Sequence, residues 1–391
     1  MAERPQLELV VVGGGIIGLA VAWRARARGM EVTVLERDTA GAATSHVAAG
    51  MLGPVAEVQF GESGRRLLEL GLRSAELWPS FASELEGDSG VDVGLMRTGT
   101  LLLARDADEA RELERQLAFR GSLGLPIERL RPSEAREREP ALAPTVRLAL
   151  EAPDDHSVDP RLVLAALRAA CLASGVKLRE HALVARIELA GGRVTGLLLA
   201  GGERLRAANV VLAAGPWSER IEGLPEGARV PVRPVKGQIL RLRDREGPGL
   251  LRRVVRFEGG YVVPRADGRY VLGATVEERG FQALPTVGGV YELLRDASEL
   301  VPGVSELEIE ELSVGFRPGT PDNAPAIGPS SVQGLTWATG HYPNGILLAP
   351  LTAEMVVGLL AGGERASELL AACAPGRFAP REPGPPVEAL G

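Results

Sequence analysis

The sequence predicts an α/β fold with two interleaved domains, one built on a parallel sheet and a smaller α+β domain built on an antiparallel sheet. Three features predict this fold. The chain opens on an apolar strand, a glycine turn and a helix; a second apolar run, residues 209–215, also ends in glycine; and residues 230–312 contain short strands joined by turns. The length of 391 residues suits two to three domains.

The first βαβ unit follows from the order of the residues. Residues 7–12 are apolar except for Glu8, which is typical of a strand buried on both faces. A helix is expected over residues 16–28, and Gly29 suits its C-terminal cap. Residues 32–35 form the second strand, so the chain begins as a Rossmann-like domain.

The glycine turn of this unit has the spacing that binds a dinucleotide. Gly13 allows the tight turn, Gly15 lets the backbone approach a pyrophosphate, and Gly18 lets the helix pack close to the strand. Glu36 follows the second strand, where a carboxylate accepts hydrogen bonds from an adenosine ribose. Because a carboxylate there repels a 2′-phosphate, the residues favour FAD or NAD over NADP.

The middle of the chain leaves this domain and returns to it. Helices are expected over residues 64–85 and 106–120, with a strand over residues 99–104 between them. Asp159 is expected to be the N-cap of a helix that ends at Gly175. Further strands are expected at residues 176–179, 182–189, 193–199, 204–206 and 209–215.

Residues 230–312 have an antiparallel pattern. Two apolar runs, residues 261–264 and 270–275, flank Asp267 and Gly268, and Asp-Gly between strands is a strong hairpin signal. A helix is expected over residues 290–300.

Both domains are therefore expected to be discontinuous. The Rossmann-like domain is assigned residues 1–90, 151–225 and 315–372, and the second domain residues 91–150 and 226–314. The chain is rich in proline after about residue 371, so residues 373–391 are expected to form a flexible tail.

The composition argues against several classes of protein. The formal net charge of −7 and the lack of a basic stripe argue against nucleic-acid binding. No apolar run reaches the length of a membrane span, and the start of the chain lacks a signal-peptide pattern, so we expect a cytoplasmic protein. The two cysteines and four histidines have no metal-binding spacing.

Four later segments indicate a type of flavoprotein. They read TSHVAAGML at residues 44–52, VLAAGPWS at 211–218, RPGTPD at 317–322 and GHYPNGILLAP at 340–350. In this order they resemble the D-amino-acid oxidase superfamily, and within it the glycine oxidases of thiamine biosynthesis. The resemblance extends from the glycine turn to about residue 360.

This resemblance implies a fold and a reaction. Such enzymes pair an FAD-binding domain with a smaller substrate domain, whose antiparallel sheet covers the flavin ring. They oxidise an amine to an imine, which hydrolyses to a keto acid and ammonia, and they reduce dioxygen to H2O2. For this chain the resemblance implies non-covalently bound FAD, oxidation of glycine, sarcosine or small D-amino acids, supply of glycine imine for the thiazole of thiamine, and a homotetramer.

The glycine motif and the family pattern together assign a set of cofactor-binding residues. No general base is assigned, because donation from the lone pair of a neutral substrate amine drives hydride transfer to flavin N5. The cofactor-binding set is Gly13, Gly15, Ile16, Ile17, Gly18, Glu36, Arg37, Thr44, Ser45, Ala49, Gly50, Met51, Val184, Gly215, His341, Tyr342, Asn344, Gly345, Ile346 and Leu347.

The last part of this set has its own expected role. Residues 345–348 are expected to open a helix, whose free amides and positive end would face the N1 and C2=O edge of the flavin. Negative charge develops at that edge when the flavin is reduced, so residues 341–347 would stabilise the reduced cofactor.

The substrate carboxylate is assigned to Arg317 and Tyr261 by match to the glycine oxidases. A guanidinium can hold a carboxylate through two hydrogen bonds, and a tyrosine hydroxyl adds a donor. The family usually has arginine where this chain has Pro343, which offers neither charge nor donor. Three alternatives follow: glycine is bound weakly, another amine is preferred, or another group such as Arg97 or Arg256 compensates.

Two other functions remain open at this point. The same fold could serve a dehydrogenase that passes electrons to an acceptor other than oxygen, or a non-catalytic FAD-binding module. The presence of Arg317 and Tyr261 argues against the module.

Overall fold

The glycine turn lies at the end of a six-stranded sheet in the computed structural model, which describes residues 8–362 and 368–379. The strand order is β18-β19-β12-β1-β2-β8, and the neighbours run parallel except β18, which is antiparallel to β19. The strands are β1 (Glu8–Val12), β2 (Glu31–Leu35), β8 (Lys177–Arg179), β12 (Asn209–Leu212), β18 (Ala326–Pro329) and β19 (Leu335–Thr339).

Alternate residues of β1 face two separate hydrophobic cores. Leu9 and Val11 pack against helices, whereas Val10 and Val12 pack against a small three-stranded sheet. A parallel strand covered on both faces needs apolar residues at its buried positions, which explains the run of four at residues 9–12 after the exposed Glu8. The helices are α1 (Ile16–Ala27), α3 (Glu62–Ser89), α6 (Pro160–Ala173) and α8 (Ala349–Leu360), and the small sheet is β9 (Val184–Ala190), β10 (Arg193–Leu199) and β11 (Arg204–Arg206).

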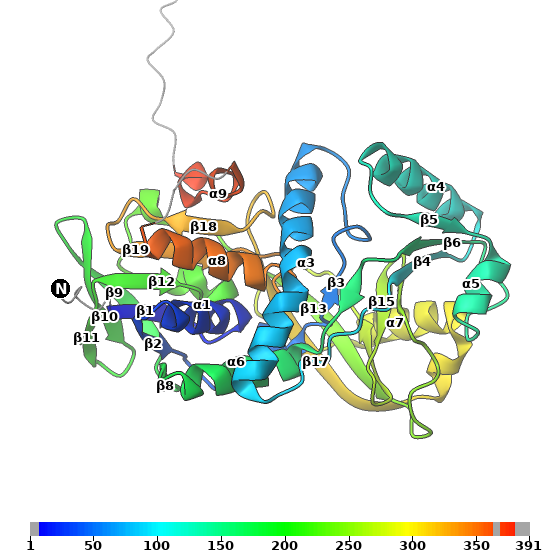
Figure 1. Cartoon of the computed structure of the whole chain (residues 1–391), viewed down its shortest axis with the longest axis horizontal. Helices are drawn as coiled ribbons and strands as arrows, with labels where there is room; N and C mark the ends of the chain where they lie inside the picture. Colours follow the sequence, from blue (N-terminus) through cyan, green and yellow to red (C-terminus); the bar gives the residue numbers. More distant parts are fainter. Residues whose placement is uncertain (1–7, 363–367, 380–391) are drawn as a thin grey trace, which may run out of the picture.

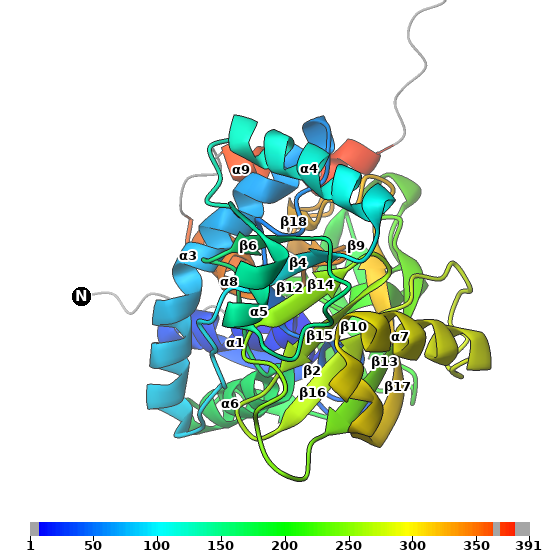
Figure 2. The ribbon, with the colours of Figure 1, turned by 90° about the vertical axis from the view of Figure 1, so that its right-hand side faces the viewer.

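A second sheet of eight strands forms the other half of the molecule (Figure 1). Its order is β17-β13-β16-β15-β14-β4-β6-β5, and its neighbours are antiparallel except β14 and β4. The strands are β4 (Thr100–Ala104), β5 (Glu128–Leu130), β6 (Leu148–Ala152), β13 (Arg233–Arg243), β14 (Val254–Phe257), β15 (Gly260–Pro264), β16 (Arg269–Gly273) and β17 (Glu308–Gly319). Figure 2 looks at this end and shows α4 (Ala107–Ser122), α5 (Pro132–Arg138) and α7 (Val287–Leu300) around the sheet.

The remaining elements are short. They are α2 (Thr44–Val47), β3 (Met51–Leu52), β7 (His156–Ser157), η1 (Gly215–Arg220), η2 (Glu226–Ala228), η3 (Pro302–Glu306), α9 (Glu368–Ala372) and η4 (Pro375–Phe378).

The fold class predicted from the sequence is confirmed. The predicted hairpin is present, with Tyr261 opposite Gly273 and Pro264 opposite Tyr270. The eight-stranded sheet takes its strands from residues 100–152 and 233–319, and β17 continues past the domain junction predicted at residue 314. The domain boundaries themselves stay a prediction.

The segment after residue 371 differs from the expectation of a frayed tail. Cys373 is fully buried, and its carbonyl accepts a hydrogen bond from Ile327 N–H at 2.9 Å. Arg377 then pairs with Asp322 at 2.8 Å. An apolar thiol and a charge pair therefore hold residues 373–379 against β18, while residues 380–391 of the predicted tail lie outside the described residues.

One helix start was predicted correctly and another was wrong. Asp159 is the N-cap of α6, as expected, and accepts a hydrogen bond from Arg161 N–H. The helix expected to open at residue 345 begins instead at Ala349. Pro350 has no N–H to donate to the Ile346 carbonyl, which accepts from Ala349 instead, so residues 345–348 form turns before the regular helix.

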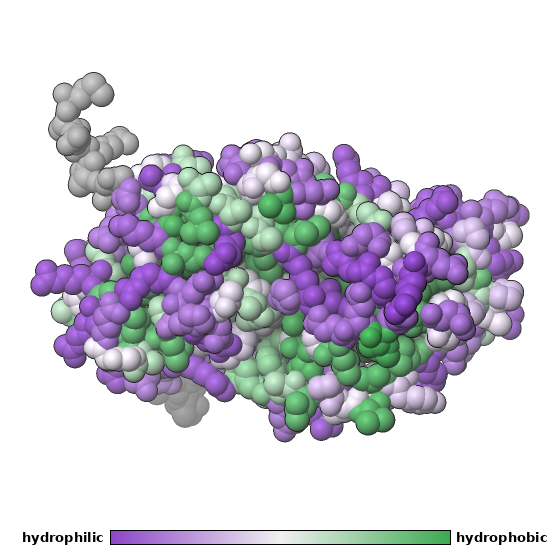
Figure 3. Space-filling model, turned by 90° about the horizontal axis from the view of Figure 1, so that it is seen from below, coloured by the Kyte–Doolittle hydropathy of each residue, from purple (hydrophilic) through white to green (hydrophobic). Residues whose placement is uncertain are grey.

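Arginines on the surface are balanced by acidic residues. Exposed arginines pair with acidic residues in several places, for example Arg179 with Glu203 and Arg186 with Glu222. Figure 3 shows hydrophilic residues spread over the whole of one face rather than in a single band. Within residues 8–362 and 368–379, no helix is both long and apolar enough to span a bilayer.

Candidate active site

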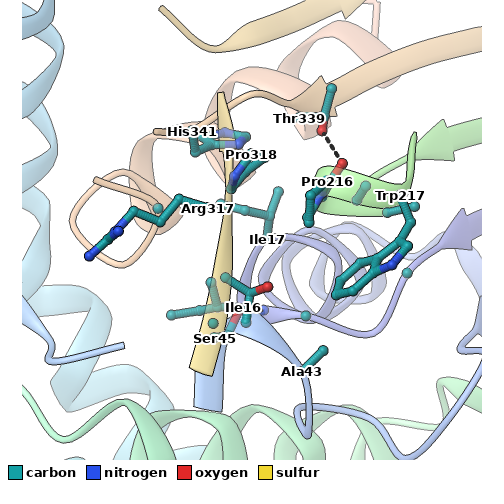
Figure 4. A pocket seen from close by; sticks show the side chains of 18 of the residues that line it. Ile16, Ile17, Ala43, Ser45, Pro216, Trp217, Arg317, Pro318, Thr339 and His341 are labelled. Carbon is teal, nitrogen blue, oxygen red and sulfur yellow. Dashed lines mark hydrogen bonds between the residues drawn. The ribbon is translucent and has the colours of Figure 1, made fainter. Parts of the chain in front are cut away.

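A cavity of about 540 Å³ extends from the carboxyl ends of β1, β2 and β12 to the eight-stranded sheet. Figure 4 shows it from close by: Ile16 and Ile17 come from the start of α1, Trp217 from η1, and Arg317 from β17. In this view Trp217 and the guanidinium of Arg317 point to opposite ends of the group of labelled residues. The volume is within the range of small-molecule sites.

The glycine turn can be built only from glycine at two of its positions. Gly13 has φ +107°, and a Cβ there would lie 2.5 Å from the Ala213 carbonyl oxygen. A Cβ on Gly18 would lie 1.9 Å from the Gly13 oxygen, so this glycine allows α1 to pack against the turn. Gly15 differs, because the nearest atom to its Cβ position is Ser45 Oγ at 3.4 Å. Its open side belongs to the cavity wall, next to the start of α1.

Glu36 is fixed where β2 ends. Its carboxylate is buried and accepts hydrogen bonds from Gly14 N–H at 2.7 Å and from Asp38 N–H at 2.9 Å. A carboxylate has about four acceptor sites, so capacity remains for hydroxyl groups in the cavity.

The loop that follows is held from both sides. Ser45 Oγ accepts a hydrogen bond from Ile16 N–H at 3.1 Å, and the Thr44 hydroxyl donates to the Phe316 carbonyl of β17 at 2.9 Å. Gly50 has φ +82°, and its Cβ position lies 2.1 Å from the Val158 carbonyl, so only glycine fits there. The small residues of this loop therefore let it pass between the two sheets along the cavity.

Arg317 lines the cavity from strand β17. It donates to the carbonyls of Thr275 at 3.0 Å and Lys236 at 3.5 Å, and it forms no ion pair among residues 8–362 and 368–379. Tyr261 lines the cavity beside it, and burial raises the pKa of the Tyr261 hydroxyl, which therefore stays a neutral donor. A cation without a carboxylate partner and a neutral hydroxyl form a site suited to an external carboxylate.

The turn before α8 is anchored by a distant helix. The Leu347 carbonyl accepts hydrogen bonds from Ser74 Oγ at 2.6 Å and Trp78 Nε1 at 2.9 Å, both on α3. Leu348 N–H donates to the Asn344 carbonyl at 2.9 Å. The N–H groups of residues 345–347 have no hydrogen-bond acceptor in the described part of the chain, and these residues line the cavity.

Comparison with known proteins identifies the family of the chain and the cofactor of the cavity. The family described as FAD dependent oxidoreductase matches residues 8–359. The chain belongs to this family of FAD-dependent oxidoreductases. This confirms FAD as the cofactor and the family resemblance found in the sequence.

Relatives within the family cover almost the whole chain. The glycine oxidase of Geobacillus kaustophilus is 36% identical over 364 residues, which cover 93% of this chain and 95% of that protein. Its crystal structure matches with a TM-score of 0.87 and 35% identity, over 97% of this chain and 100% of the other.

Two further relatives differ in extent or in substrate. The bifunctional protein ThiO/ThiG of Trichormus variabilis is 38% identical over 355 residues, 90% of this chain but 52% of that protein. The chain therefore spans about half the length of that relative. The iminodiacetate oxidase of Chelativorans sp. BNC1 matches with a TM-score of 0.83 and 28% identity, over 92% of this chain and 97% of that one.

The residues present fit FAD as the bound group. The open side of Gly15 and the start of α1 suit a pyrophosphate, and Glu36 suits a ribose. All residues assigned from the sequence line the cavity except Gly18, which packs behind the turn, and Tyr342. Their individual contacts with FAD and substrate stay predictions.

Of the two arginines considered as substitutes for the arginine missing at position 343, neither is a free cation in the cavity. Arg97 is exposed and is not among the described residues of the cavity wall. Arg256 pairs with Glu57. Pro343 itself lines the cavity next to Asn344.

Two cavity residues were missed in the sequence. Trp217 stacks on Phe281, with ring centroids 5.4 Å apart, and the Arg37 guanidinium lies 3.7 Å from the centroid of its indole ring. Its position two residues after Gly215, the glycine that ends a buried strand, was an available signal. Glu57 also lines the cavity, and no local sequence pattern distinguishes it from a surface carboxylate.

His341 is a structural residue as well as a cavity residue. Its Nε2 lies 3.0 Å from Thr352 Oγ1, and burial lowers the pKa of the imidazole to about 3. The ring is therefore neutral at physiological pH and adds no positive charge to the cofactor site.

The burial of His341 predicts a pH dependence of stability. The folded pKa is depressed below the ordinary value of 6.5, so the unfolded chain takes up a proton first as pH falls. The free energy of unfolding is therefore expected to fall below pH 6.5, by about 1.4 kcal/mol for each pH unit. Urea denaturation measures the free energy of unfolding of the wild type and of His341→Gln. The difference between the two, wild type minus variant, should decrease by about 2 kcal/mol from pH 7.5 to pH 5. A difference in the free energy of unfolding that does not change with pH contradicts this account.

Proposed function

We propose that this FAD enzyme oxidises glycine and other small amines, including sarcosine and small D-amino acids, with release of H2O2. The observation that carries the proposal is Arg317, a guanidinium without a carboxylate partner in the described chain, in the FAD cavity beside the Tyr261 hydroxyl. The relatives named glycine oxidase support the same substrate.

The two residues bind and orient the substrate. Arg317 is itself held by the main-chain carbonyls of Thr275 and Lys236, so its remaining N–H groups are available for the substrate carboxylate. Tyr261 adds a neutral donor from strand β15 of the same sheet. A small amino acid held by its carboxylate presents its α-carbon to the cofactor in a fixed direction.

Bound at the glycine turn and Glu36, FAD would supply the acceptor for a hydride from the α-carbon and the route by which electrons reach dioxygen. The chain supplies the electrostatic support for this chemistry from the turn at residues 345–347. The N–H groups of these residues have no acceptor in the described chain and line the cavity, so they are available to stabilise the negative charge of a reduced cofactor. Leu347 is fixed in this turn because its carbonyl accepts hydrogen bonds from Ser74 and Trp78.

The proline at position 343 predicts weak glycine binding. Arg317 and Tyr261 are the only assigned carboxylate contacts, because Arg256 is paired with Glu57 and Arg97 lies outside the cavity. Pro343→Arg is expected to lower the KM for glycine by about ten- to a hundredfold, the effect of one charged hydrogen bond of about 1.5–3 kcal/mol. Steady-state kinetics with glycine measures it. An unchanged or higher KM means that position 343 does not contact the carboxylate.

Peroxide release tests the proposed reaction. The FAD-loaded protein is mixed with glycine, sarcosine or D-alanine in air, and H2O2 and ammonia or methylamine are measured. Release of H2O2 in proportion to substrate consumed is expected. Rapid reduction of an artificial dye with no H2O2 would instead support a dehydrogenase, and no reaction with any small amine would support the non-catalytic module.

The cellular role extends this proposal. We infer that the protein acts in the cytoplasm as a homotetramer, binds FAD without a covalent bond, and supplies glycine imine for the thiazole of thiamine. The bifunctional relative and the glycine oxidases support this role. Light scattering of the purified protein tests the tetramer, and release of FAD on acid precipitation tests the non-covalent attachment.

A further inference from the structure

Glu57 brings an ion pair to the part of the cavity that Arg317 and Tyr261 line. Its carboxylate lines the cavity with Tyr261 and Arg317, and it pairs with the guanidinium of Arg256. Arg256 is not among the described residues that form the cavity wall. At the cavity wall, Glu57 therefore neutralises a cation that is not itself part of the wall.

The register of the sheet places this pair next to the substrate. Arg256 on β14 is directly opposite Tyr261 on β15, so the two side chains are neighbours on one face, with Cβ atoms about 4.5–5.5 Å apart. The hydroxyl of Tyr261 is within electrostatic reach of Arg317, Glu57 and Arg256. A substrate held by Arg317 and Tyr261 thus has the Glu57–Arg256 pair beside it.

The main chain before Glu57 is fixed independently of its carboxylate. The buried Asp155 carboxylate accepts hydrogen bonds from the N–H groups of Val55 at 3.1 Å and Ala56 at 2.5 Å. The buried Arg120 donates to the carbonyls of the same two residues at 2.8 and 2.9 Å. Removing the carboxylate of Glu57 therefore leaves the contacts that hold this loop.

We propose that Glu57 is a specificity-determining residue that excludes amines with a second carboxylate, because it places a negative charge in the cavity wall and neutralises Arg256 behind it. In the wild type, a second substrate carboxylate meets the like charge of Glu57. Without that charge, it meets the unpaired guanidinium of Arg256 and can pair with it. The inference rests on the proposed function, since Arg317 holds the first carboxylate.

Two substrates that differ by one carboxylate test the proposal. Sarcosine and iminodiacetate are both N-substituted glycines, with a methyl and a carboxymethyl group respectively. Glu57→Gln and Glu57→Ala are each expected to raise the ratio of kcat/KM for iminodiacetate to that for sarcosine by about tenfold or more, mainly through a lower KM for iminodiacetate. The double variant Glu57→Gln with Arg256→Gln is expected to lose this gain.

Binding of carboxylates that cannot be oxidised separates this inference from the reaction. Glutarate and butyrate replace the substrate nitrogen by a methylene group, and their binding to the FAD-loaded protein is followed by the change in flavin absorbance. The Kd for glutarate relative to butyrate should fall about tenfold in Glu57→Gln. This titration decides the inference even if the wild type oxidises neither amine, a result that would contradict only the proposed function.

A remote pair of the same kind provides the matched control. Glu84 pairs with Arg24 at the surface, so Glu84→Gln removes the same charge from the protein far from the cavity wall. In this variant the kcat/KM ratio of iminodiacetate to sarcosine and the Kd ratio of glutarate to butyrate are both expected to stay at the wild-type value. Equal ratios in the wild type and in both Glu57 variants overturn the proposal, as does a gain that persists in the double variant.

Discussion

Replacing Arg317 with alanine is expected to lower kcat/KM for glycine by about a hundredfold or more. The guanidinium has no ion-pair partner in the described chain, and a charged hydrogen bond is worth about 1.5–3 kcal/mol, so loss of a two-bond contact has a large effect. Most of the loss should appear in KM, with a further decrease in kcat because the α-carbon is no longer held in place. Steady-state peroxide assays with glycine measure both parameters.

Two comparisons make this result specific. Arg317→Lys keeps the charge but not the planar pair of donors, and is expected to retain an intermediate activity. FAD content, measured from the flavin absorbance, should be close to that of the wild type in both variants, because the Arg317 guanidinium is bonded to Thr275 and Lys236 and not to the glycine turn. A kcat/KM within threefold of the wild type in Arg317→Ala would show that the carboxylate binds elsewhere.

Replacing Gly15 with alanine is expected to weaken FAD binding by about ten- to a hundredfold while the apoprotein still folds. Gly15 has φ −75°, which any residue adopts, and its Cβ would meet nothing closer than Ser45 Oγ at 3.4 Å. The added methyl group would instead occupy the cavity where the pyrophosphate approaches the backbone. The loss corresponds to one charge-assisted hydrogen bond of about 1.5–3 kcal/mol. Fluorescence titration of the apoprotein with FAD measures it.

Gly358 offers a matched glycine-to-alanine control. It lies in α8, and no atom lies within 4 Å of its Cβ position. Gly358→Ala should bind FAD like the wild type and unfold at an equal or slightly higher temperature, since alanine favours a helix. If Gly15→Ala binds FAD as tightly as Gly358→Ala does, the pyrophosphate does not approach the backbone at Gly15.

Local patterns predicted the cofactor half of the site well. The strand, turn and helix around Gly13 and Gly18, the carboxylate of Glu36 and the hairpin that carries Tyr261 all depend on residues close together in sequence. The family resemblance added the later segments, which line the same cavity although they are far apart in the chain.

The parts that were missed depend on contacts between distant segments. Leu347 is fixed by Ser74 and Trp78, and Arg256 by Glu57, and neither contact has a signal in the local sequence. The late start of α8 follows from the N–H that Pro350 lacks, because the Ile346 carbonyl then accepts from Ala349 instead.

The central claim is that Arg317 holds the carboxylate of an amino acid so that its α-carbon faces the cofactor. Anaerobic mixing of the FAD-loaded protein with glycine, and separately with methylamine, tests it most directly, because methylamine has the amine but no carboxylate. The account predicts that glycine bleaches the flavin absorbance and that methylamine does so at least about a hundredfold more slowly at equal concentration. No bleaching with glycine, or equal rates with the two amines, would contradict it.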